Sequence, residues 1–209
     1  MSDDFELLER WQAGDRAAAK QLFERHFDAI YRFLASKVDN GVDDLVQETF
    51  LACVQGRDRF RGASSFRGYM FGTARNVLLS HYRKRRRFES VEDVGSSRLI
   101  DLDPTASRML AKREEERLVL EGLRRVPLDY QIILELYYWE GLSGPEVAEL
   151  LGISLTAMRS RLHRAKQELL EQLQSLSSST DVLASTLSDL DGWAVALRRR
   201  LNSAKSEDQ

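Results

Sequence analysis

The chain is poor in the residues that interrupt helices or cross-link folds. Its 209 residues include only 3 prolines and 12 glycines, and runs of alternating β-branched residues are scarce, which disfavours a sheet-rich fold. A single cysteine, Cys53, excludes an internal disulfide and fits a reducing compartment. Because its neighbours are apolar, we expect Cys53 to be an inert, packed thiol.

Long apolar runs and targeting signals are also missing. No stretch of about eighteen apolar residues could span a membrane. The acidic, amphipathic start of the chain does not resemble a signal peptide. We therefore expect a cytoplasmic protein with no membrane span of its own.

Signatures of catalysis are absent as well. There is no glycine-rich phosphate loop, no nucleophile motif and no metal-ligand spacing among Cys53, His26, His81 and His163. We expect these histidines to be structural or on the surface. The sequence therefore predicts neither an enzyme nor a bound cofactor or metal.

The residues that are abundant in the chain are helix formers. Leu, Ala, Glu, Arg and Gln dominate, with 43% hydrophobic and 31% charged residues. We expect an all-α protein with two small helical domains, at residues 1–88 and 106–176. A flexible linker at 89–105, marked by Gly-Ser-Ser and Asp-Pro, would join them, and residues 177–209 would form a C-terminal extension.

Apolar spacing locates the helices of the first domain. A short helix ends before Gly14, and Asp15 can cap the next one. Along that second helix we expect one apolar stripe, formed by Ala18, Leu22, Phe23, Phe27, Ile30, Tyr31 and Leu34. Asn40-Gly41 breaks the pattern, and further helices are expected at about 42–55 and 65–87.

The net charge of −2 hides a strong asymmetry. Residues 57–87 carry ten basic side chains and one acid, whereas residues 89–116 carry eight acids and four bases. A concentrated basic segment in a nearly neutral protein indicates a face that binds a polyanion.

The sharpest motif is a helix-turn-helix at residues 141–169. Ser143 and Glu146 can form a capping box, with Pro145 in the first turn. Val147, Leu150 and Leu151 would face the core. Gly152 suits the turn, and Ser154 can cap a second helix that buries Met158, Leu162 and Ala165.

Such a second helix enters the major groove of DNA. The candidate contacts to bases and phosphates are Ser154, Thr156, Ala157, Arg159, Ser160, Arg161, Arg164 and Lys166. Of these, Arg159 suits a base edge, whereas Arg161, Arg164 and Lys166 suit phosphates. The alternative is a helical hairpin with a solvated basic face.

This motif resembles the domain of extracytoplasmic-function sigma factors that reads the minus-thirty-five promoter element. The shared residues are Pro127, the run from Glu140 to Ser143, and the run from Ser160 to Ala165. The chain differs at Ala157-Met158, where the family's sequence specificity is set.

The basic helix at residues 64–87 interleaves aromatic rings with arginines, an arrangement suited to single-stranded nucleic acid. It resembles the sigma-factor helix that opens the minus-ten element, through Phe66, Tyr69, Ala74-Arg75-Asn76 and the run from Tyr82 to Arg87. The resemblance implies that the loop at about 59–65 captures an unpaired base. The implied minus-ten contacts are Arg59, Phe60, Arg61, Ser64, Ser65, Arg67, Tyr69, Arg75, Asn76, Tyr82 and Arg83. The alternative for the aromatic residues is core packing.

The helix at residues 42–55 carries acidic and amide side chains and resembles the family's polymerase-docking helix. The implied core-polymerase contacts are Asp43, Asp44, Leu45, Gln47, Glu48 and Phe50. The alternative is that acids at a helix N-terminus merely suit the helix dipole.

The resemblance implies a transcription initiation factor that binds core RNA polymerase and promoter DNA and is commonly restrained by an anti-sigma factor. A stand-alone helix-turn-helix regulator is the alternative function, although such a protein has no use for the aromatic-basic helix.

The C-terminal extension at residues 177–209 lies outside the resemblance. Its leucines recur from Leu183 to Leu201 at helical spacing, which predicts a docked amphipathic helix rather than a frayed tail.

Overall fold

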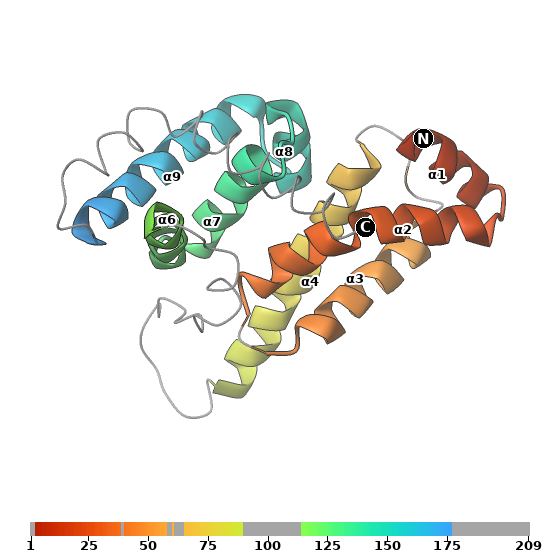
Figure 1. Cartoon of the computed structure of the whole chain (residues 1–209), viewed down its shortest axis with the longest axis horizontal. Helices are drawn as coiled ribbons and strands as arrows, with labels where there is room; N and C mark the ends of the chain where they lie inside the picture. Colours follow the sequence, from red (N-terminus) through yellow and green to blue (C-terminus); the bar gives the residue numbers. More distant parts are fainter. Residues whose placement is uncertain (1–2, 39, 58–59, 61–64, 90–113, 177–209) are drawn as a thin grey trace. The chain divides into compact units, whose positions relative to one another are not determined.

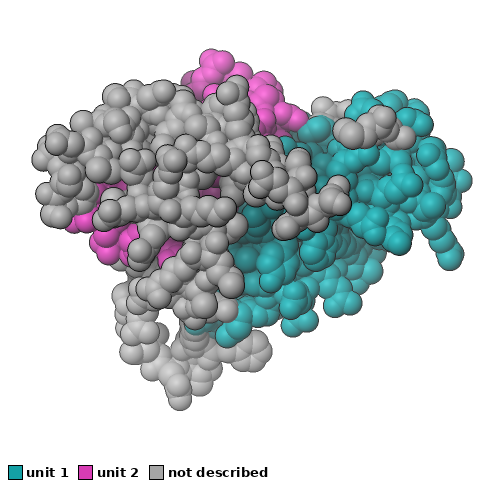
Figure 2. Space-filling view, in the orientation of Figure 1, with its two compact units in different colours: residues 1–97, 149–151 teal, residues 98–148, 152–209 magenta. Residues whose placement is uncertain are grey.

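The computed structural model of the chain describes residues 3–38, 40–57, 60, 65–89 and 114–176. Every element within these ranges is a helix, as the sequence predicts. The chain divides into two compact units, coloured separately in Figure 2. Unit 1 comprises residues 1–97 and 149–151, and unit 2 the remainder. The expected linker from residue 90 onward and the whole expected extension at 177–209 lie outside the described residues.

Unit 1 contains α1 (Asp4–Gln12), α2 (Arg16–Ala35), α3 (Val42–Gln55) and α4 (Phe66–Glu89). Helix α2 packs against the other three, and α3 runs alongside α4 (Figure 1). The predicted cap is confirmed, since the Asp15 carboxylate accepts hydrogen bonds from the first free amides of α2.

The core of unit 1 corrects the expected apolar stripe on α2. Leu22, Ile30 and Leu34 are fully buried, as expected. Phe27 and Tyr31, however, are 43% and 37% exposed, because no described segment covers that side of α2. Periodicity identified an apolar face that is wider than the part buried within the unit.

Helix α1 is held to α2 by a charged cluster. His26 Nε2 lies 2.7 Å from an Asp4 carboxylate oxygen and donates to it, because an ionised carboxylate can only accept. Arg25 pairs with the other oxygen of Asp4. These contacts, with the His26 hydrogen bond as the largest, hold the pKa of Asp4 below its ordinary value.

We predict an acid-dependent weakening of this attachment. Since the folded pKa of Asp4 is depressed, its contribution is present above the unfolded pKa of about 4 and lost as pH falls through the folded value. Asp4→Asn should cost about 1 kcal/mol of unfolding free energy at pH 7. Denaturant unfolding at a series of pH values should show that the difference shrinks as pH falls below the unfolded pKa of about 4 and disappears once Asp4 is protonated in the folded protein; a difference that persists in acid would contradict this origin.

Unit 2 contains α6 (Glu114–Arg125), α7 (Leu128–Leu134), a π-helical turn (Glu135–Trp139), most of α8 (Gly144–Leu151) and α9 (Leu155–Leu176). Helix α9 packs against both α6 and α7 (Figure 1). The π-helical turn was not predicted.

A buried glutamine joins α6 to α7. Gln131 is 6% exposed, and its Nε2 donates to the carbonyl of Val126 at 2.9 Å. This hydrogen bond satisfies a backbone group just after the C-terminus of α6, where helical carbonyls lack partners. The sequence offered no sign of this role.

Gly122 sets the distance between α6 and α9. A Cβ atom at this position would lie 2.8 Å from Leu173 Cδ2 and 3.3 Å from Leu169 Cδ1. Gly122→Val should therefore lower the unfolding free energy of unit 2 by about 2 kcal/mol through overpacking. Gly122→Ala is the matched control. Its smaller side chain clashes less, and alanine gains about 1 kcal/mol in helix propensity over glycine, so it should be more stable than Gly122→Val. Thermal unfolding should therefore separate the two variants. Equal stability of both would contradict close packing here.

Candidate functional site

The exposed face of α3 has an acidic half and an apolar half. Asp44, Gln47 and Glu48 are exposed near its N-terminus, followed by Leu51 and Val54 at 55% and 48% exposure. Helical spacing places all five on one side, opposite a buried side formed by Leu45, Val46, Thr49 and Cys53. Such a face can bind a basic partner and bury apolar surface against it.

Three residues of the expected docking set lie outside the centre of this face: Leu45, Asp43 and Phe50, of which Phe50 is half-buried. Leu45 is 4% exposed and lies in the core, which corrects its assignment as a direct contact. Asp43 is exposed on the edge of the face.

Cys53 is fully buried, and burial raises the pKa of its thiol to about 11, so the packed-thiol prediction is confirmed.

Aromatic side chains extend this face onto α2. Phe27 stacks against Phe50 of α3 and against Tyr31, with centroid distances of 5.9 and 6.1 Å. Sequence analysis placed Phe27 and Tyr31 on the apolar stripe of α2 and did not identify them as surface residues. Because isolated apolar residues are common on surfaces but contiguous exposed ones mark contact sites, this cluster indicates a protein interface.

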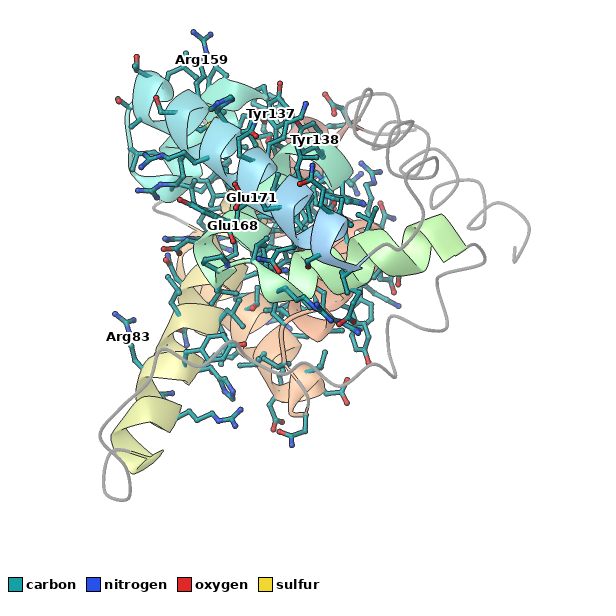
Figure 3. The ribbon with its side chains drawn as sticks, turned by 90° about the vertical axis from the view of Figure 1, so that its left-hand side faces the viewer. Arg83, Tyr137, Tyr138, Arg159, Glu168 and Glu171 are labelled. Carbon is teal, nitrogen blue, oxygen red and sulfur yellow. The ribbon has the colours of Figure 1, made fainter. Side chains whose placement is uncertain are left out.

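On α4, three candidate DNA contacts share one side. Tyr69, Asn76 and Arg83 are spaced seven residues apart, which places them on a single stripe. Asn76 and Arg83 are exposed, Tyr69 is half-buried, and Arg83 points away from the helix in Figure 3. An aromatic ring, an amide and a guanidinium in line can stack on a base, hydrogen-bond to a base edge and bind a phosphate.

The other candidates on α4 lie off this stripe. Arg67 is half-buried, with its guanidinium 5.6 Å from the Phe71 ring centroid. Arg75 is also half-buried, and its Nε is enclosed without a hydrogen-bond partner. Tyr82 donates its hydroxyl proton to the carbonyl of Lys37, just after the end of α2. This hydrogen bond ties α4 to the end of α2, so the hydroxyl is used within the unit.

For two aromatic residues of α4, burial decides between DNA contact and core packing. Phe66 and Phe71 are 4% and 1% exposed, so core packing is confirmed for both. The hydroxyl of Tyr69 donates to the Cys53 carbonyl at 3.4 Å. A Cβ at Gly56 would clash with that hydroxyl, so a glycine here leaves room for the Tyr69 side chain.

The segment before α4 is described only in part. Arg59, Arg61 and Ser64 lie outside the described residues, whereas Phe60 and Ser65 lie within them. The Ser65 hydroxyl accepts a hydrogen bond from Gly68 N at 3.1 Å and caps α4.

The helix-turn-helix forms as its local signals predict. Ser143 N and Oγ both donate to Glu146 Oε2, at 2.8 and 2.7 Å, which completes the capping box. Gly152 adopts a φ of +66°, the left-handed turn conformation that favours glycine. Ala157 N donates to Ser154 Oγ at 3.1 Å, so Ser154 caps α9.

Burial in this motif differs slightly from expectation. Val147, Met158 and Ala165 are buried, as predicted. Leu150, Leu151 and Leu162 are only half-buried rather than core residues. These positions lie at the edge of their helical faces, where burial depends on what packs beside them.

The exposed face of α9 gathers most candidate DNA contacts. The exposed candidates on it are Thr156, Ala157, Arg159, Ser160 and Arg164, and His163 is also exposed on this face. Arg161 and Lys166 are half-buried on its flanks, and Ser154 is exposed at its start. Arg159 points away from the ribbon near the N-terminal end of α9 (Figure 3), which is the end a recognition helix directs toward bases.

No group of three or more His, Cys, Asp or Glu side chains in the described residues could hold a metal ion. No helix among them is long and apolar enough to cross a membrane.

Comparison with known proteins identifies both halves of the chain. The family model for Sigma-70 region 2 matches residues 22–88, and that for Sigma-70, region 4 matches residues 116–169. The ECF RNA polymerase sigma-E factor of Haemophilus influenzae is 32% identical over 83% of this chain and 96% of its own length. RNA polymerase sigma factor CarQ of Myxococcus xanthus is 33% identical, covering 81% of this chain and 97% of its own.

Solved structures agree in fold. CnrH, in complex with the cytosolic domain of CnrY, matches with a TM-score of 0.63 and 27% identity over 83% of this chain and 99% of its own. The sigma factor RpoE of Bartonella quintana, bound to the anti-sigma factor NepR, matches in fold with a TM-score of 0.61 and 24% identity over 74% of this chain and 96% of its own.

Members of this family are transcription factors rather than enzymes, and they direct RNA polymerase to promoters. With both conserved regions matched and relatives aligned along nearly their whole length, the chain belongs to the extracytoplasmic-function group of the sigma-70 family and is a transcription initiation factor.

Proposed function

We propose a division of labour within this chain. The exposed face of α3 binds core RNA polymerase, α4 and the segment before it hold the unpaired minus-ten strand, and α9 reads the minus-thirty-five duplex. Residues 1–88 and 106–176 then act as the two functional domains. The protein acts in the cytoplasm and opens DNA by binding energy, with no reaction catalysed by this chain and no cofactor.

Polymerase docking is supported by the composition of the α3 face. Asp44 and Glu48 carry charge, while Leu51, Val54 and the aromatic cluster of Phe27 and Phe50 carry apolar surface. Charged groups steer association and fix register, whereas buried apolar surface supplies most of the affinity. The same face suits an anti-sigma partner that competes with polymerase. The relative CnrH is bound to a second protein, which supports such a partner here.

Strand opening is supported by one observation above the others: Tyr69, Asn76 and Arg83 form a stripe along α4. The ring of Tyr69 can stack on the face of a flipped base, the amide of Asn76 can hydrogen-bond to its edge, and the guanidinium of Arg83 can bind its phosphate. A duplex-binding regulator needs no such set.

Tyr69→Ala should therefore impair opening and spare the duplex contact. Loss of one stacked base corresponds to about 1–3 kcal/mol. Permanganate footprinting of polymerase bound to a promoter should show reduced thymine reactivity at the minus-ten element. Binding to a minus-thirty-five duplex should be unchanged.

Leu79→Ala, at a half-buried position of the same helix, is a control for nonspecific damage to α4 and should open the promoter normally. Normal thymine reactivity with Tyr69→Ala would contradict the proposed stripe.

A further inference from the structure

Five aromatic residues connect α1 to the segment that precedes α4. The Trp11 ring lies edge-on to Phe23 and Phe66, with centroids 5.2 and 6.1 Å apart. Phe60, from the segment between α3 and α4, packs perpendicular to Phe66 at 6.1 Å and lies 5.0 Å from Tyr69. Residues far apart in sequence thus share one apolar cluster that ends at Tyr69, the proposed stacking residue.

The end of α1 also contacts the segment through polar groups. Gln12 Nε2 donates to the carbonyl oxygen of Phe60 at 3.5 Å. Arg57 Nη1 donates to the carbonyl oxygen of Trp11, also at 3.5 Å, and its guanidinium lies 6.0 Å from the Trp11 ring centroid. Each hydrogen bond is long, but together they connect α1 to two positions of the segment, Arg57 and Phe60.

Helix α1 is itself fixed in place. Asp3 caps its first turn, Asp4 pairs with His26 and Arg25, and Arg10 pairs with Asp15 at 2.7 Å. Trp11 is only 5% exposed. A helix held at both ends can act as a rigid support, because its side chains cannot move without breaking several contacts at once.

The match to the Sigma-70 region 2 family begins at residue 22, so α1 lies outside it. The polymerase-docking face lies on α3, a different helix. Helix α1 therefore has no role in the functions assigned so far.

We propose that α1 is a brace for minus-ten recognition: Gln12 holds Phe60 directly and Trp11 holds it through Phe66, so that Phe60 and Phe66 fix the ring of Tyr69, the proposed base-stacking residue. Trp11 and Gln12 are positioning residues and do not touch DNA. This inference rests on the proposed minus-ten role of α4 and its preceding segment.

The test uses full-length variants assembled with core polymerase. The probe is a fluorescent single-stranded oligonucleotide carrying the non-template minus-ten sequence of a promoter that the wild type opens. Anisotropy measures oligonucleotide affinity, and affinity for core polymerase is measured in parallel as a check that unit 1 is folded. The variants are Trp11→Ala, Trp11→Phe, Gln12→Ala and, as a matched control on the exposed side of α1, Glu9→Ala.

Trp11→Ala should weaken oligonucleotide binding about tenfold, the equivalent of one lost stacked base. Polymerase affinity should stay within about twofold, well under the tenfold that 1.4 kcal/mol represents. Trp11→Phe should restore most of the loss, since a ring can still pack against Phe66. Gln12→Ala should weaken oligonucleotide binding measurably, and Glu9→Ala should leave it unchanged.

Wild-type oligonucleotide affinity in Trp11→Ala would overturn the inference. If Trp11→Ala loses polymerase affinity as well, Gln12→Ala decides, because its exposed side chain can be shortened without opening the core; unchanged binding then overturns the brace. Tyr69→Ala separates the two proposals. Normal binding by Tyr69→Ala contradicts the proposed function, whereas weak binding by Tyr69→Ala alongside normal α1 variants contradicts only the brace.

Discussion

Reversal of Asp44 and Glu48 to lysine is expected to abolish holoenzyme assembly. Both carboxylates are exposed on one face of α3, beside Gln47 and Leu51. The change converts attraction to a basic partner into like-charge repulsion, which costs several kcal/mol across an interface. Since the buried side of α3 is untouched, the fold should persist. Co-purification with core polymerase, with circular dichroism as a fold check, measures the outcome.

A matched control is available on α1. Glu6 and Glu9 are exposed acids of the same unit, and their reversal to lysine makes the same change in net charge. This second variant should still assemble with polymerase. Undiminished assembly of the Asp44 and Glu48 variant, or equal loss in both, would remove α3 as the docking helix.

Replacement of Arg159 by alanine should cost about 1–3 kcal/mol of binding to the cognate minus-thirty-five duplex. Arg159 is exposed near the N-terminal end of α9 and points outward (Figure 3), so a guanidinium there can reach a base edge. The loss should be confined to cognate DNA, with relaxed preference at one base pair. Affinities for a set of single-substitution duplexes at fixed salt would measure both effects.

Arg161→Ala supplies the contrast. Arg161 is half-buried on the flank of α9, a position suited to a phosphate, so its removal should weaken all sequences alike and reduce the salt dependence by about one counterion. Equal losses on cognate and scrambled DNA for Arg159→Ala would place that residue on the backbone instead.

Helices and caps were predictable because their causes are local. The capping box joins residues three apart, Ser143 and Glu146, and the turn at Gly152 needs only a residue that tolerates positive φ. The bounds of α3 agree with the predicted range because Gly41 and Gly56 flank it on both sides. The heptad spacing of Tyr69, Asn76 and Arg83 was also present in the sequence, although only the burial of their neighbours made it meaningful.

Surface and core were harder to separate, because periodicity reports which residues share a face and not what covers that face. Phe27 and Tyr31 continue the stripe of Leu22, Ile30 and Leu34, yet they remain exposed. Leu45 lies between Asp44 and Gln47 in sequence, yet it is on the opposite side of α3. In each case burial depends on a neighbouring helix whose position the local sequence does not specify.

The sequence by itself determined the α-helices of unit 1, the helix-turn-helix, their order and the family, since these follow from local propensity and motif spacing. Tertiary structure decided which side chains act together. The approach of Gln12 to Phe60, the hydrogen bond between His26 and Asp4 and the close packing of Gly122 on Leu173 all join residues that are distant along the chain. Such contacts arise because each amphipathic helix must bury its apolar face against another, and the partner it finds is a property of the whole fold.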